Sequence, residues 1–203
     1  MRTGIRNILG AVALVAATSF ITAQVVSQDQ PPQDDQWQEW MKYAEPGPEH
    51  ERLSKHVGTW EQETTFWMYP GAEAQTSAST ATVQPMLGGR FFMEKVEGEA
   101  GFLGMPEKFE GLGLHGFDRT QDKYVFAWAD NMGTMIMTGE GTADESGKVI
   151  TYYSEMPDPI EGGTVEMKSV TRMVSDEEYI YEMYHKQPDG SWFKNMKLVA
   201  KKK

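Results

Sequence analysis

The sequence predicts an all-β fold: a single antiparallel β-barrel of about ten strands, preceded by a short N-terminal helix. The chain after Gly58 divides into short strand-like runs that recur at roughly 8 to 12 residues, as in barrels and sandwiches. No run beyond Gly58 has the length of a helix that would connect parallel strands. Several runs also mix aromatic and polar residues on one face, which favours a barrel with an internal cavity over a dry sandwich.

Residues 1–23 have the pattern of an export signal. Arg2 and Arg6 supply a positive end, and the segment 8–23 is apolar and finishes in small residues. We predict cleavage after Ala23 and a mature chain that is periplasmic or secreted. The alternative is an uncleaved anchor, but the apolar run contains Thr and Ser and is shorter than the about 20 residues of a membrane span. The mature chain is therefore expected to hold no membrane span.

Residues 24–45 are expected to form a flexible tether that is acidic and rich in Gln. Within it, "WQEWMKYA" permits one or two helical turns, because Trp37, Trp40 and Met41 then share one side. The β-barrel domain is expected to cover residues 46–203.

A short helix is predicted at the start of that domain. Pro48 suits a first helical position, acidic residues follow it, and Lys55 and Gly58 suit the finish. Leu53 and Val57 lie on its apolar side, so the helix must pack against something larger.

Alternation along the predicted strands assigns their faces. In the first strand Trp60, Gln62 and Thr64 share one face, whereas Glu61 and Glu63 share the other and are expected to be solvated. The predicted strands are 59–68, 76–85, 87–98, 108–117, 123–132, 133–142, 149–156, 163–174, 177–185 and 192–200. An Asp-Gly pair in "QPDGS" predicts a tight turn before the last of them. The fourth run, "GLGLHG", has little side-chain bulk and is expected to leave room in the lumen.

Composition excludes several classes of function. The chain has no cysteine, which excludes disulfides, a thiolate nucleophile and a thiolate metal site. It carries 30 acidic against 19 basic residues, a formal net charge of −11. Such an acidic protein repels nucleic acid, so a nucleic-acid partner is not expected.

Two sets of motifs resemble known families. The Gly58-Thr59-Trp60 step after a short helix is similar to the lipocalin and calycin signature. That resemblance implies a lipocalin-like, calycin-type barrel in which Trp60 closes the floor and a late basic residue, Arg172 or Lys197, packs across it. The longer motifs "PGPEHERLSKHVGTWE", "LGGRFF", "FEGLGLHGFD", "KYVFAWADNM", "GEGTADE" and "VTRMVSDEEYIYEMY" resemble a bacterial family known as domain of unknown function 1579. The second resemblance spans about 46–203 and implies no reaction, ligand or catalytic residue.

The function expected from these features is non-enzymatic binding of a small, partly apolar ligand inside the barrel. Arg90 or Arg172 would anchor an acidic group, Trp128 and Tyr181 would pack on the ligand, and Trp60 would shape the closed end. The full set of expected ligand-binding residues is Trp60, Arg90, Phe92, His115, Trp128, Asp130, Arg172 and Tyr181. No catalytic residue, metal or cofactor is expected.

Other interpretations of the same residues stay open. Arg90 would also suit an ion pair with Glu94 or Asp130. Of the histidines, His115 and His185 are the plausible cavity members, and no cluster has metal-ligand spacing. The methionines of "NMGTMIM" would suit Cu(I), although adaptable core packing explains them better.

Two alternative functions remain open as well. The first is an interaction module whose tether and aromatic residues Trp37, Trp40 and Trp67 bind another envelope component. The second is an enzyme that uses His115 with Asp130 in the lumen.

Overall fold

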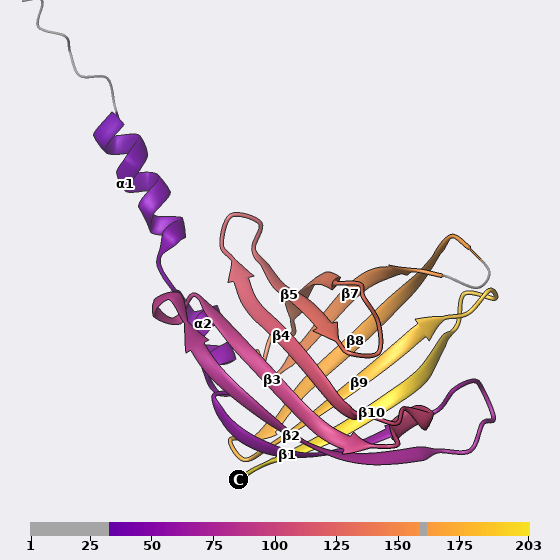
Figure 1. The fold of residues 1–203 in the computed structure, drawn as a ribbon. Coiled ribbons are helices and arrows are strands. Elements are labelled where there is room, and N and C mark those ends of the chain that lie inside the picture. The colour runs from indigo at the N-terminus through magenta and orange to yellow at the C-terminus, as the bar shows by residue number, and fades with distance from the viewer. Residues whose placement is uncertain (1–32, 159–161) are drawn as a thin grey trace, which may run out of the picture.

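The protein is a closed barrel of antiparallel strands preceded by two helices (Figure 1). The computed structural model describes residues 33–158 and 162–203. The predicted signal, its cleavage after Ala23 and the tether up to residue 32 lie outside the described residues. The helices are α1 (Gln33–Ala44) and α2 (Pro48–Ser54), and the strands are β1 (Gly58–Phe66), β2 (Gln75–Met86), β3 (Phe91–Ala100), β4 (Lys108–Asp118), β5 (Lys123–Asp130), β6 (Met137–Ala143), β7 (Val149–Pro157), β8 (Thr164–Ser175), β9 (Glu178–Lys186) and β10 (Trp192–Lys202).

The first and last strands close the sheet on itself. Each strand pairs with its neighbours in the chain, and β1 pairs with both β2 and β10. The β1–β10 register runs from Trp60 opposite Lys202 to Phe66 opposite Met196. Because every described strand has a partner on both sides, the ten strands leave no open sheet edge. The predicted all-β, ten-stranded antiparallel barrel is confirmed.

Because the sheet is closed, alternate side chains of each strand face the interior of the barrel or the solvent. On β1, Trp60 and Gln62 are buried, whereas Glu61 and Glu63 are exposed. The predicted faces of β1 are therefore correct, and the two glutamates belong to the solvated outer surface.

Trp60 fills the end of the barrel that carries α2. Its side chain is fully buried, and its Nε1 donates a hydrogen bond of 2.7 Å to the carbonyl oxygen of His56. Its ring meets Tyr179 edge-on, with 4.8 Å between ring centroids. The ammonium of Lys202 lies 5.2 Å from the indole centroid, within cation–π range. The basic residue across the tryptophan is thus Lys202, not Arg172 or Lys197, because Lys202 is the direct β10 partner of Trp60.

Glycines on the inner face admit large side chains from neighbouring strands. A Cβ on Gly111 would lie 2.5 Å from the ring of Trp128, and one on Gly139 would lie 2.5 Å from the ring of Phe126. The small residues of "GLGLHG" do leave room, as predicted, but the indole of Trp128 occupies part of it. These strands therefore have no side chains at the glycine positions, and aromatic rings from neighbouring strands occupy that space.

Two arginines hold the C-terminal end of α1. Arg90 Nε donates a 2.7 Å hydrogen bond to the carbonyl of Ala44, and Arg119 Nη1 donates to the carbonyls of Lys42 and Glu45. The last carbonyls of a helix lack partners within the helix and favour cations, which explains this arrangement. The rest of α1 extends away from the barrel (Figure 1).

Two predicted strand starts are wrong for local reasons. The segment Leu87–Gly89 forms a short 3-10 turn with positive φ angles, so β3 begins at Phe91. Residues 133–136 form part of the β5–β6 loop, and β6 begins only at Met137.

The burial of Trp60 gives a first prediction. Replacing Trp60 by Ala should lower the free energy of unfolding by about 3 to 5 kcal/mol, because it removes a large ring from a packed site and leaves a cavity. Denaturant unfolding followed by far-ultraviolet circular dichroism measures this loss. The matched change Trp37→Ala, at a ring that is 56% exposed on α1, should cost less than about 0.5 kcal/mol. Equal losses would show that Trp60 does not support the barrel.

Candidate functional site

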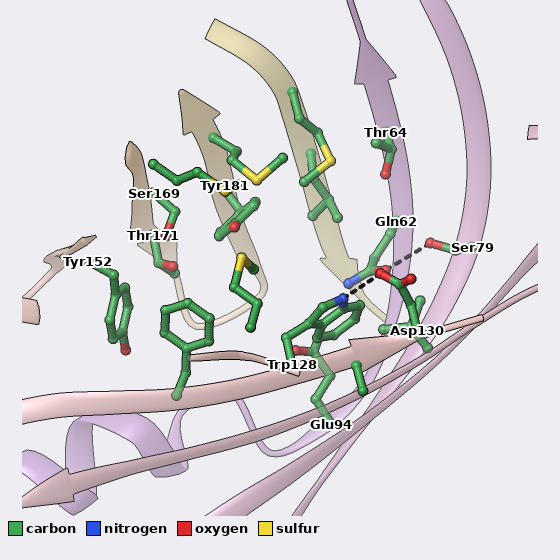
Figure 2. A pocket seen from close by; sticks show the side chains of 18 of the residues that line it. Gln62, Thr64, Ser79, Glu94, Trp128, Asp130, Tyr152, Ser169, Thr171 and Tyr181 are labelled. Carbon is green, nitrogen blue, oxygen red and sulfur yellow. Dashed lines mark hydrogen bonds between the residues drawn. The ribbon is translucent and has the colours of Figure 1, made fainter. Parts of the chain in front are cut away.

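The barrel encloses a cavity of about 520 Å³ to which every strand contributes side chains (Figure 2). This volume is in the range of small-molecule sites in proteins, about 300 to 1,000 Å³. The lining is mainly aromatic and aliphatic, with polar side chains in a few places. The cavity is therefore the candidate site.

Polar side chains gather near the end that Trp60 closes. We call this group the polar floor; it consists of His56, Gln62, Ser79, Glu94, His115 and Tyr179. Gln62 Nε2 donates a 3.0 Å hydrogen bond to Tyr179 Oη, and Ser79 Oγ donates one of 2.8 Å to Gln62 Oε1. These bonds join β1, β2 and β9, so the side chain of Gln62 is fixed from two sides. Figure 2 shows Gln62, Ser79 and Glu94 at the same end of the pocket.

Glu94 and its partner His115 form the titratable pair of the polar floor. His115 Nε2 lies 3.1 Å from Glu94 Oε2, and the two side chains are 27% and 16% exposed. Burial by itself would raise the pKa of Glu94, but the hydrogen bond and charge of His115 outweigh it and hold that pKa below its usual value. Glu94 therefore stays an ionised hydrogen-bond acceptor inside the barrel.

His56 contributes a buried nitrogen with no hydrogen-bond partner in the described structure. It follows α2, packs edge-on against Tyr179 at 5.2 Å, and its Nε2 is inaccessible to solvent. Burial, and next the neighbouring His115, lower the pKa of His56 to about 4. The imidazole is neutral at physiological pH, so one ring nitrogen offers a free lone pair.

The middle of the cavity is a wall of hydroxyl-bearing and aromatic side chains. Tyr152, Ser169, Thr171 and Tyr181 come from the adjacent strands β7, β8 and β9 (Figure 2). Burial raises the pKa of Tyr181 to about 12, so its hydroxyl keeps its proton. The wall is neutral, and its hydroxyl groups can donate or accept hydrogen bonds.

Methionines surround the opposite end. We call this group the methionine mouth; it consists of Met132, Met135, Met137, Met156, Met167, Met183 and Met196. Half of the 14 methionines in the chain thus line one cavity. Because thioether side chains are flexible and polarisable, this end can adapt to apolar surfaces of different shapes.

Asp130 holds the loop at the mouth. Its Oδ2 accepts a 2.8 Å hydrogen bond from Trp128 Nε1, and its Oδ1 accepts one of 3.0 Å from the Met132 amide. The partner of His115 is Glu94 instead. The pair of His115 with Asp130, on which the enzyme interpretation depends, is therefore not formed.

A β-bulge turns Asn195 inward near the mouth. The register between β9 and β10 shifts between Lys194 and Met196, and Asn195 is 2% exposed. Its Nδ2 lies 3.2 Å from His185 Nε2, while its Oδ1 has no hydrogen-bond partner in the described structure. Burial lowers the pKa of His185, so that ring favours its neutral form.

The structure brings together five of the eight predicted site residues. Phe92, His115, Trp128, Asp130 and Tyr181 line the cavity, and His185 also does. Alternation along the strands is sufficient to find them.

The other three predicted residues do not line the cavity. Trp60 lies beneath the polar floor, where it plugs the closed end. Arg90 precedes β3 and reaches the end of α1, and Arg172 is exposed on β8. The expected anchors for an acidic ligand group are therefore absent from the lumen.

The expected site residues leave out several polar members of the site, among them His56, Gln62, Ser79, Tyr179 and Asn195. Alternation does place Glu94 inward beside Phe92 on β3, but as an ion-pair partner of Arg90 and not as a site residue. His56 belongs to the helix region, where strand alternation gives no signal, and Asn195 turns inward only through the bulge.

Two further properties hold for the part of the chain that the structure describes. Residues 33–158 and 162–203 contain no group of three or more His, Asp or Glu side chains placed to hold a metal ion. Neither described helix has the length and apolar character needed to cross a membrane.

Comparison with known proteins gives one family match and structures of similar fold. A family model described as "Protein of unknown function (DUF1579)" matches residues 45–202. The crystal structure of Rv2717c from M. tuberculosis is similar with a TM-score of 0.56 and 15% identity, over 78% of this chain and 99% of the other. The S-type phycobiliprotein lyase CPES from Guillardia theta is similar with a TM-score of 0.52 and 11% identity, over 78% and 98%. Comparison with curated proteins gives no match. At these identities the likeness concerns the fold alone.

The buried imidazole of His56 predicts acid sensitivity. In the unfolded chain this histidine binds a proton near pH 6.5, whereas in the folded protein its pKa is about 4. The free energy of unfolding should therefore fall as the pH drops through this interval, by up to about 3 kcal/mol from His56. In the variant His56→Gln the same fall should be smaller by that amount.

Urea unfolding at several pH values between 4 and 6.5 measures how the free energy of unfolding changes with pH. Comparing this pH dependence between the two proteins removes any effect of the substitution on stability at neutral pH. Parallel curves for the two proteins would contradict the burial of a neutral His56.

Proposed function

The chain belongs to the DUF1579 family of proteins of unknown function, and from that premise we propose that it is a non-enzymatic binding barrel for a small, partly apolar ligand. The observation that carries the proposal is the cavity of about 520 Å³ inside the closed barrel. Its lining combines a methionine mouth, an aromatic wall and a polar floor, so one end of the site suits apolar groups and the other suits polar ones.

The chemistry of the lining favours binding over catalysis. Glu94 and His115 are paired with each other, and Asp130 is occupied by the indole of Trp128 and the amide of Met132. The hydroxyls of Tyr179 and Tyr181 keep their protons, since burial raises the pKa of both. None of these groups is paired with a nucleophile, so the arrangement supports recognition of a ligand.

A second candidate function is supported by α1. Trp37 and Trp40 stack with 5.1 Å between ring centroids, yet they are 56% and 57% exposed. Tyr43 on the same helix is 53% exposed. Exposed aromatic side chains on a projecting helix suit contact with another protein of the cell envelope.

We also propose that the protein works outside the cytoplasm. The apolar segment 8–23 behind Arg2 and Arg6 supports export, and the absence of cysteine is compatible with any redox compartment.

A blocked lumen tests the binding function. Thr64 lines the cavity on β1, whereas Thr65, the next residue, lies on the outer face opposite Lys197. In the variant Thr64→Trp the indole should fill part of the lumen and weaken binding of the neutral apolar dye Nile red by about tenfold or more. The matched variant Thr65→Trp adds the same indole outside and should bind Nile red as the unmodified protein does. Fluorescence titration measures both.

The same titration separates the two candidate functions. A protein that lacks residues 24–43 should keep its barrel, whose strands begin at Gly58, and should still bind Nile red, while an envelope partner held by α1 would be lost. If unmodified protein, with its native circular dichroism spectrum, gives no enhancement of Nile red fluorescence, the binding barrel is wrong.

Export is tested by the intact mass of the protein isolated from its host. The protein isolated from cell envelope or culture medium of its host should have the intact mass of a chain that begins at Gln24. Recovery of a chain that still begins at Met1 from the cytoplasm would contradict the proposal.

A further inference from the structure

We propose that the ligand places a hydrogen-bond donor, a hydroxyl or an amine, on the polar floor, and that the lumen rejects carboxylates. This inference deepens the proposed function and depends on it. It concerns the polar end of the ligand, and it reverses the expectation that arginines anchor an acidic group.

The first argument is the absence of permanent cations. Among the described residues that line the cavity there is no lysine and no arginine. Arg90 donates to the carbonyls of Ala44 and Leu87, outside the barrel lumen. A carboxylate that entered would lose its hydration and find no lysine or arginine, and the imidazole of His115 is already paired with Glu94, so its burial is costly.

The second argument is the carboxylate on the polar floor. Burial opposes the ionisation of Glu94, but its interactions with His115 outweigh burial and hold the pKa of Glu94 below its usual value, so this side chain is ionised at neutral pH. An anionic head group would meet this carboxylate, whereas an ammonium could pair with it.

The third argument is that the polar floor offers an acceptor that a ligand can reach. The Glu94 side chain lines the cavity and is 16% exposed, and its Oε2 lies 3.1 Å from His115 Nε2. A carboxylate has lone pairs on two oxygens, so Glu94 can also accept a hydrogen bond from a ligand hydroxyl or amine.

Three probes with one tail and different head groups test the inference. Decylamine, decanol and decanoate share the same apolar chain, so its burial contributes equally and the head group decides the difference. In competition with Nile red at neutral pH and moderate salt, decylamine and decanol should displace the dye at concentrations at least about tenfold lower than decanoate. Decylamine is also titrated against the blocked variant Thr64→Trp. Any binding that remains there measures the attraction of the amine to the acidic outer surface and is subtracted.

One substitution and its control assign the effect to the polar floor. Glu94→Gln keeps the shape of the side chain and removes its charge, so the preference for decylamine over decanoate should shrink by about tenfold. Glu97→Gln, on the outer face of the same strand, is the matched control and should leave the ratio of decylamine to decanoate affinity unchanged.

The outcomes separate the inference from the proposed function. If Nile red binds but decanoate displaces it as well as the other two probes or better, the head-group inference is overturned and the binding barrel stands. The head-group inference is overturned in the same way if Glu94→Gln and Glu97→Gln change the ratio equally. If Nile red does not bind at all, the proposed function fails first, and the inference fails with it.

Discussion

The pairing of β1 with β10 is the constraint on which the rest of the structure depends. It joins segments from opposite ends of the domain, from Trp60 opposite Lys202 to Phe66 opposite Met196, and so removes both sheet edges. Once the sheet is closed, every second side chain of every strand must point inward. Ten strands enclose more space than these side chains fill, and the remainder is the cavity of about 520 Å³.

The two ends of this cavity differ because the chain closes only one of them. At the α2 end, the indole of Trp60 is anchored by the His56 carbonyl and covered by Lys202, and it supports the polar floor above it. At the other end, methionines and the loop held by Asp130 surround the opening. Polar groups are thus deepest where water is least accessible, which strengthens any hydrogen bond made there.

The lining of the site could be predicted to the extent that it follows strand periodicity. Alternation places Phe92, Trp128 and Tyr181 inside, and it places Glu94 inside as well. The expected partner of Glu94 was Arg90, whereas the structure pairs it with His115. Arg90 failed because the turn Leu87–Gly89, with its positive φ angles, takes it out of the strand before periodicity begins. Its guanidinium then reaches the end of α1, a contact between parts of the chain 46 residues apart.

The sequence by itself determined most of the secondary structure, the inward face of most strands and the barrel class, because these follow from local periodicity, turn residues and the lack of crossover helices. Only the tertiary structure decided which polar groups meet. The pairing of Glu94 with His115 depends on the β3–β4 register, the burial of His56 depends on how α2 packs on the closed end, and the inward turn of Asn195 depends on a bulge. Such contacts are set by strand register and packing across the barrel, and no local pattern records them.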